Sequence, residues 1–175
     1  NIINGGGSIQ KLGTGTLSLQ TPSPGFTGQI TVDSGILKLA DSVLGKELED
    51  YREGSPKLSI AADAKVIALG SKNYVQLLNG SGDLELGESA SFVIQSNASS
   101  SVFDGKISGE GDLILSGSDA DLTLTSGNTL EGKIYVNQPK RKATPKQIIL
   151  SGSATLGSAD LLLVGDNTEL VFDRA

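Results

Sequence analysis

Short stretches of alternating apolar and polar residues recur along the chain, and the most regular of them lies between Lys11 and Leu39. Apolar residues spaced two apart occur there as three pairs: Leu17 and Leu19, Ile30 and Val32, and Leu37 and Leu39. Side chains two residues apart point to the same face of a strand, so each pair predicts a short strand with one buried face. Glycines precede the pairs, and glycine allows the sharp bends that must separate such short strands.

The same spacing returns further along the chain. Gly-x-Gly followed by an alternating apolar pair occurs at residues 13–19, 80–86 and 109–115, with a looser copy at 5–9. Phenylalanine or leucine followed by x-Gly-x-Ile occurs at residues 26–30, 103–107 and 130–134. A unit of this size has too little bulk to enclose a core of its own, and it must bury its apolar face against its neighbours. The repeat therefore predicts an all-β solenoid.

An antiparallel sandwich is the competing fold, because successive apolar pairs from Leu58 onward start eight or nine residues apart. Hairpins prefer Asn-Gly at their two-residue turns, and Asn-Gly occurs only at residues 4–5 and 79–80. A three-sided coil instead needs one corner per strand, which gives a turn of roughly 20 to 30 residues. Phe103 and Leu130 are about one such turn apart. We therefore favour parallel coils.

Two segments interrupt the rhythm of strands. Residues 41–57 carry apolar residues at helical spacing, from Val43 to Tyr51, and predict a short helix packed on the outside of the solenoid. Residues 138–147 contain two prolines that bracket basic residues, and they predict a protruding loop. We expect residues 1–175 to form one β-helix segment with 41–57 and 138–147 as inserted loops. The absence of methionine, including at position 1, predicts that the segment belongs to a longer chain.

The residue types that are missing restrict the chemistry. The chain has no histidine and no cysteine, which removes Ser-His and Cys-His nucleophilic sites and thiolate metal sites. Aspartates in the middle of the chain leave a carboxylate pair for glycan hydrolysis open: Asp104, Asp112, Asp119 and Asp121. We assign no catalytic residue, metal or cofactor, and expect no enzymatic activity.

A calcium site is a further alternative, because Gly-x-Gly-Asp occurs at residues 80–83 and 109–112. The calcium-binding nonapeptide has the order Gly-Gly-x-Gly-x-Asp in tandem copies. Here the aspartate follows glycine directly and the copies are not in tandem. We interpret both aspartates as solvent-facing residues beside the start of a strand.

The charge distribution restricts the partners. A net charge of -6 argues against nucleic acid or an anionic membrane as a partner. The chain has no apolar run long enough to span a membrane as a helix, so we expect no membrane contact from this segment. Basic residues gather in the predicted loop 138–147, which makes it a candidate partner-binding loop for an anionic receptor such as a sulfated glycan: Lys140, Arg141, Lys142 and Lys146.

The stretch from Gly5 to Gly45 resembles the autotransporter-associated β-strand repeat of passenger domains that bacteria export by type V secretion. The family pattern runs lysine, Gly-x-Gly, a leucine pair, aromatic-x-Gly, Thr-x-Val and Gly-x-Leu. The matching positions here are Lys11, Gly13, Gly15, Leu17, Leu19, Phe26, Gly28, Ile30, Val32, Gly35 and Leu37. Ile30 replaces the threonine that the family often has, and partial copies of the pattern extend to about Val136.

The resemblance implies a right-handed parallel β-helix that is displayed on the bacterial cell surface or secreted through the outer membrane. It implies a rigid, non-enzymatic stalk that presents loops for adhesion to host cells, through a receptor or glycan, or for self-association. Two alternatives of other classes stay open. One is a polysaccharide-active β-helix enzyme, and the other is the receptor-binding part of a secreted toxin passenger.

Overall fold

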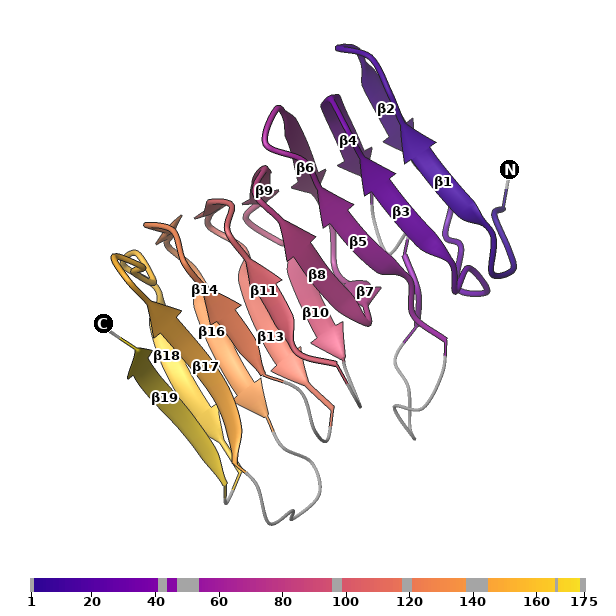
Figure 1. The fold of residues 1–175 in the computed structure, drawn as a ribbon. Helices are drawn as coiled ribbons and strands as arrows, with labels where there is room; N and C mark the ends of the chain where they lie inside the picture. The colour runs from indigo at the N-terminus through magenta and orange to yellow at the C-terminus, as the bar shows by residue number, and fades with distance from the viewer. Residues whose placement is uncertain are drawn as a thin grey trace.

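The structure is a computed structural model that describes residues 2–40, 44–46, 54–95, 99–117, 121–137, 145–165 and 167–173. In this part of the chain the strands pair in parallel and form three sheets. The chain winds through about seven turns, and its two ends lie at opposite ends of the stack (Figure 1). The predicted parallel β-helix is confirmed, and the antiparallel sandwich is excluded.

The chain winds through an 8-stranded, a 6-stranded and a 5-stranded sheet in that order, and the turns from β5 to β16 contribute one strand to each sheet. The 8-stranded sheet consists of β1 (Ser8–Lys11), β3 (Gln29–Val32), β5 (Lys57–Ile60), β8 (Leu77–Gly80), β11 (Ser101–Phe103), β14 (Leu122–Leu124), β17 (Lys146–Ser151) and β19 (Thr168–Asp173). The 6-stranded sheet consists of β2 (Thr16–Leu19), β4 (Gly35–Leu39), β6 (Ala64–Ala68), β9 (Asp83–Leu86), β12 (Ile107–Gly109) and β15 (Thr129–Leu130). The 5-stranded sheet consists of β7 (Asn73–Val75), β10 (Ser91–Gln95), β13 (Asp112–Ser116), β16 (Lys133–Asn137) and β18 (Asp160–Val164).

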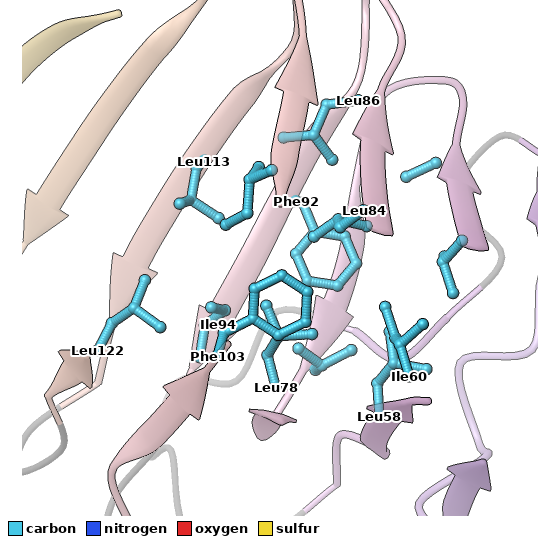
Figure 2. Packing of buried hydrophobic residues seen from close by; sticks show 14 of the residues in the cluster. Leu58, Ile60, Leu78, Leu84, Leu86, Phe92, Ile94, Phe103, Leu113 and Leu122 are labelled. Carbon is cyan, nitrogen blue, oxygen red and sulfur yellow. The ribbon is translucent and has the colours of Figure 1, made fainter. Parts of the chain in front are cut away.

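Apolar side chains stack in columns through the interior, because equivalent residues of successive turns pair in register. One column of the 6-stranded sheet runs from turn to turn through four paired residues: Leu37, Val66, Leu84 and Ile107. Figure 2 shows side chains from several turns pointing into one shared interior, with the rings of Phe92 and Phe103 among them. Each fully buried aliphatic or aromatic side chain contributes about 1.5–3 kcal/mol relative to an exposed one. The columns therefore join the turns into a single core.

The two glycine motifs of the sequence interlock between neighbouring turns. The first glycine of Gly-x-Gly pairs with the phenylalanine of Phe-x-Gly one turn later, as Gly80 pairs with Phe103. This pairing places Gly105 directly over Gly82, and a Cβ atom on Gly105 would overlap the Gly82 carbonyl oxygen. The ring of Phe103 lies across Gly105 on the other side. Glycine is required because two backbones approach too closely for a side chain.

The same contact recurs at two other places. Gly5 pairs with Phe26, and Gly109 pairs with Leu130. Two residues later, Gly28 lies over Gly7 and Gly132 lies over Gly111. Each of these three Gly-x-Gly copies therefore lies beneath a Phe-x-Gly or Leu-x-Gly copy one turn later. The copy at Gly13 and Gly15 lies beneath Gly35 instead.

The lysine of the repeat is a structural residue. Lys11 is almost fully buried, and its Nζ donates hydrogen bonds to three carbonyl oxygens, those of Leu12 at 3.0 Å, Gly13 at 2.6 Å and Ser34 at 3.0 Å. These carbonyls belong to corners of two successive turns, where no ladder hydrogen bonds are available. The ammonium group therefore ties one corner to the next.

A buried asparagine performs the same task further along the chain. Asn128 Oδ1 accepts a hydrogen bond of 2.8 Å from the Ile107 amide, and Asn128 Nδ2 donates to the carbonyls of Ser126 at 3.0 Å and Thr155 at 2.7 Å. One side chain thus satisfies backbone groups from three turns. Asn73 is also buried, and its Oδ1 accepts a hydrogen bond of 3.2 Å from the Leu44 amide. Among the described residues its Nδ2 has no hydrogen-bond partner.

The structure differs from three expectations drawn from the apolar spacing. The alternation predicts one strand at Val75 and Leu77, but Val75 ends β7 and Leu77 begins β8, because a corner at Gln76 turns the chain between them. It predicts another strand at Ala154 and Leu156, but these residues flank an isolated bridge between Thr155 and Gly127. Phe103 and Leu130 are more than one turn apart, because the register partner of Phe103 one turn later is Leu124 and Leu130 lies in the next sheet.

The predicted helix in 41–57 is wrong for the described part of that segment. Leu44 makes a parallel bridge to Ser23, and Gly45 has a φ of 64°, so neither residue continues a helix. Residues 41–43 and 47–53 lie outside the described residues. Leu44 occupies the position of a strand of the 5-stranded sheet, since the Tyr74 amide donates to its carbonyl at 2.9 Å.

Replacing Gly82 by alanine tests the close contact between turns. A Cβ atom on Gly82 would overlap the carbonyl of Ala61 in the preceding turn, whereas one on Gly7, at the same motif position in the first turn, meets nothing. We expect Gly82→Ala to lower the free energy of unfolding by about 2–3 kcal/mol and Gly7→Ala to leave it unchanged or raise it by up to about 1 kcal/mol. Urea unfolding curves of both variants measure this, and equal effects would show that the contact is unimportant.

Replacing Asn128 by leucine tests the side-chain cap. The variant leaves the Ile107 amide and the Ser126 carbonyl without their side-chain partner, and we expect a loss of about 2–4 kcal/mol in the free energy of unfolding. Asn79 provides the control, because its side chain also accepts a hydrogen bond from a backbone amide, that of Val102, but does so at an exposed site. Asn79→Leu should cost less than about 1 kcal/mol. A cost for Asn128→Leu no larger than the control would contradict the cap.

Candidate functional site

The corner between the 5-stranded and the 8-stranded sheets receives the longest connections between strands. The connections from β10 to β11, from β13 to β14 and from β16 to β17 belong to this corner, as does the connection from Leu44 to β5. The exception is the single residue Gln76 between β7 and β8. The other corners are short, for example Asp33–Ser34 and Ser81–Gly82. We call this corner the loop edge. Connecting loops on a rigid scaffold are where recognition residues concentrate, so the loop edge is the candidate functional surface.

The described ends of the 41–57 insertion are held by later turns of the solenoid. Gly45 follows the core residue Leu44 and lies beside Tyr74 in the next turn, whose amide donates a hydrogen bond to the Leu44 carbonyl. One turn further, Gln95 Nε2 donates hydrogen bonds to the Lys46 carbonyl at 2.6 Å and to the hydroxyl of Ser55. Gln95 is only 1% exposed and Ser55 is also buried. The described ends of the insertion are therefore anchored by buried hydrogen bonds.

The basic residues of the predicted partner-binding loop separate in the structure. Lys140, Arg141 and Lys142 lie outside the described residues. Lys146 is the first residue of β17, inside the range 138–147 that the sequence assigned to a loop, and its side chain is only 1% exposed. Lys146 is therefore a buried structural residue, and it is removed from the candidate partner-binding set.

The aspartates considered for catalysis lie at three different corners of the coil. Asp104 follows β11 and accepts a 2.7 Å hydrogen bond from the Thr125 hydroxyl. Asp112 begins β13 and accepts a hydrogen bond of 2.9 Å from the Lys133 amide. Asp121 precedes β14 and accepts a hydrogen bond of 2.9 Å from the Gln147 amide. Each carboxylate thus bonds to the following turn at its own corner. These three do not form the close pair that glycoside hydrolysis needs, and Asp119 lies outside the described residues.

The two Gly-x-Gly-Asp sequences are also separated. Asp83 begins a strand of the 6-stranded sheet, and Asp112 begins a strand of the 5-stranded sheet. Across the described ranges, no three carboxylates are grouped as a metal site would require. Their glycines serve the contact between turns, as shown for Gly82 and Gly111.

A hollow of about 220 Å³ lies at the N-terminal end of the stack. It is lined by Ile3, Ser18, Leu19, Gln20, Thr21 and Ser23. Leu19 faces the core column of the 6-stranded sheet, and no preceding strand covers it in the described chain. The hollow is therefore the open end of the core rather than a pocket with convergent polar groups.

Sequence reasoning missed the polar anchors Gln95 and Ser55, which hold the insertion. The signal was present, because Gln95 directly follows the apolar run Phe92–Val93–Ile94. An unbroken apolar run indicates a strand with both faces covered. A polar residue at its end therefore indicated a buried hydrogen bond on the outer face.

Among the described residues, no helix has the length and apolar character that crossing a membrane requires. No family model, no curated protein and no solved structure matches this chain. The architecture of the solenoid and the positions of its own side chains are therefore the basis for assigning a function.

Proposed function

We propose that this chain is a non-enzymatic segment of an exported bacterial surface protein of the autotransporter type. It acts as a rigid stalk that presents its loop edge for adhesion to host cells or for self-association. The observation that carries the proposal is the unequal length of the connections. The longest of them gather at one corner of the coil, the loop edge, whereas the connections at the other two corners are short.

Stiffness follows from the way the turns are joined. Every turn in the middle of the stack buries its core residues against the turns on both sides, and side chains such as Lys11 and Asn128 tie successive corners together. Bending the stack would open these contacts on one side. At about 4.8 Å per turn, seven turns give a rod on the order of 35 Å long. Such a rod holds its loops at fixed distances from one another.

The resemblance of residues 5–45 to the autotransporter repeat supports the exported location. The structure gives the shared residues physical roles that do not depend on the family. Lys11 caps corner carbonyls, Gly28 lies over Gly7, and Phe26 is buried across Gly28. These are requirements of a tightly wound parallel coil, so the resemblance rests on residues that the fold uses.

Charge reversal in the loop 138–147 tests the recognition role. We expect the chain to be retained on immobilised heparin, a sulfated glycan, and on fixed host cells, and expect Lys140→Glu/Lys142→Glu to lower retention at least about tenfold. Lys38→Glu/Lys106→Glu changes the net charge equally at exposed residues away from the loop edge and should have little effect. Sedimentation over a range of concentrations tests self-association in the same samples. Absence of both retention and self-association would contradict the proposal.

A further inference from the structure

The 8-stranded sheet runs the whole length of the stack, and its strands lie side by side in the order β1, β3, β5, β8, β11, β14, β17 and β19 (Figure 1). Because successive strands pair in register, their outward-facing residues form rows along the stack. The middle row is uncharged in all eight strands: Gln10, Thr31, Ser59, Asn79, Val102, Thr123, Ile149 and Val171. Another molecule can therefore cover this row without burying a charge.

The middle of the sheet carries an exposed apolar group. Val102 in β11 is 47% exposed, and Leu77 in β8 is half-buried in an outward position. The other exposed large apolar side chains of the described ranges lie in the first turn or in the last two strands: Ile2, Leu12, Leu163, Val164 and Phe172. Four strands of the sheet precede the gap between β8 and β11, and four follow it. An apolar centre within a polar surround is the usual anatomy of a protein interface.

The row next to the loop edge has opposite charges at equal distances from this centre. In strand order the row consists of Ser8, Gln29, Lys57, Leu77, Ser100, Asp121, Gln147 and Glu169. Lys57 lies one strand before β8, and Asp121 lies one strand after β11. Gln29 and Gln147 occupy the next positions outward on the two sides. We call this row the flanking row, and it is self-complementary when its order is reversed.

A two-fold axis can reverse the row in this way. The axis runs parallel to the strands, between two copies of the chain, and passes over the gap between β8 and β11. It places β5 of one copy over β14 of the other, so that Lys57 faces Asp121 at two places. Gln29 then faces Gln147 at two places, and Val102 lies beside the axis. An isologous pair repeats each contact, so one complementary pair of residues counts twice.

The same axis brings no like charges together on this face. The third outward row lies on the side away from the loop edge. In it and in the flanking row, each remaining carboxylate faces an uncharged residue: Glu169 faces Ser8, Asp33 faces Ser151, Asp104 faces Ser81, and Asp173 faces Leu12. An axis along the stack would instead place Glu169 opposite Asp173 and would pair no opposite charges. The charges therefore select the first arrangement.

The size of the face sets the expected affinity. The three rows span about 34 Å along the stack and about 13 Å along the strands, at about 4.8 Å per turn and 3.3 Å per residue. Two copies would bury on the order of 1,000 Å² in total, which is the low end for a specific interface. The expected pair is a reversible dimer with a Kd on the order of 10 μM.

We infer that the outward face of the 8-stranded sheet is a self-association surface, and that two copies of the chain pack through it with parallel strands and antiparallel stacks. Lys57 and Asp121 of the second copy fix the alignment, and Val102 lies at the centre of the contact. The face is pre-organised by the strand ladders, so that association orders only side chains. The inference goes beyond the proposed function, because it concerns the face of a sheet and not the loop edge.

A charge reversal and its rescue test the pairing. Sedimentation velocity of the full chain from about 1 to about 500 μM brackets the expected Kd and should show monomer and dimer. We expect Lys57→Glu to weaken the dimer at least about tenfold, because it brings like charges together at two places, and Lys57→Glu/Asp121→Lys to return the Kd to within about threefold of the wild type. Lys38→Glu is the matched control, because Lys38 is an exposed, outward-facing lysine of the 6-stranded sheet, and it should leave the Kd unchanged.

A second variant keeps the test independent of Asp121, whose carboxylate also accepts the hydrogen bond from the Gln147 amide. Val102→Lys introduces a charge beside the axis at a side chain that is already exposed. It should weaken the dimer at least about tenfold, because the centre of an interface is its most sensitive part. Urea unfolding checks that all variants are folded.

Several outcomes would overturn the inference. A chain that stays monomeric over the whole range has no such surface. A dimer that neither Lys57→Glu nor Val102→Lys weakens has its interface elsewhere, and oligomers that grow beyond the dimer indicate open stacking of the two ends. A folded Lys57→Glu/Asp121→Lys variant that associates as weakly as Lys57→Glu would show that the two-fold pairing is wrong. Heparin retention is a separate measurement, so the test of the loop edge stands whatever the outcome here.

Discussion

The structure depends on one constraint: no single turn of this chain can bury its own apolar face. A turn contributes two or three short strands, each with one or two core residues, and these are covered only by the same residues of the turns above and below. The hydrophobic effect therefore acts along the axis of the stack rather than within a turn. Register between turns follows directly, because a shift by one residue would turn every core side chain outward.

Close approach of the turns explains most of the unusual residues. Parallel ladders hold neighbouring backbones about 4.8 Å apart, and corners have fewer ladder bonds than strands. Where corners of successive turns meet, glycine avoids overlap between a Cβ atom and the neighbouring backbone, as at Gly82 and Gly105. The side chains of Lys11 and Asn128 donate hydrogen bonds to the corner carbonyl groups. Asp112, which the sequence offered as a catalytic or calcium-binding candidate, also serves the contact between turns, because its carboxylate accepts a hydrogen bond from the Lys133 amide.

The fold could be predicted from the sequence, but the corners could not. Apolar pairs such as Leu84 and Leu86 mark strands reliably because their alternation is set by the strand itself. Val75 and Leu77 misled the prediction because the single residue Gln76 turns a corner between them. The core residue of β8 is Leu78, the register partner of Leu58, and not Leu77. Lys146 was mispredicted in the opposite sense. A basic residue next to Pro145 suggested an exposed loop, but β17 begins at Lys146 and its side chain is buried. Burial of a polar group depends on partners that are distant in sequence.

The candidate functional surface follows from a difference between the corners of the coil. The loop edge borders the 5-stranded sheet and receives the longest connections. One segment that leaves the coil there is held to a later turn, because Gln95 at the end of β10 donates hydrogen bonds to the Lys46 carbonyl and to the Ser55 hydroxyl. A connection at the loop edge can therefore be fixed in place by buried side chains of the solenoid, and this is the property that the proposed recognition role of the loop edge requires.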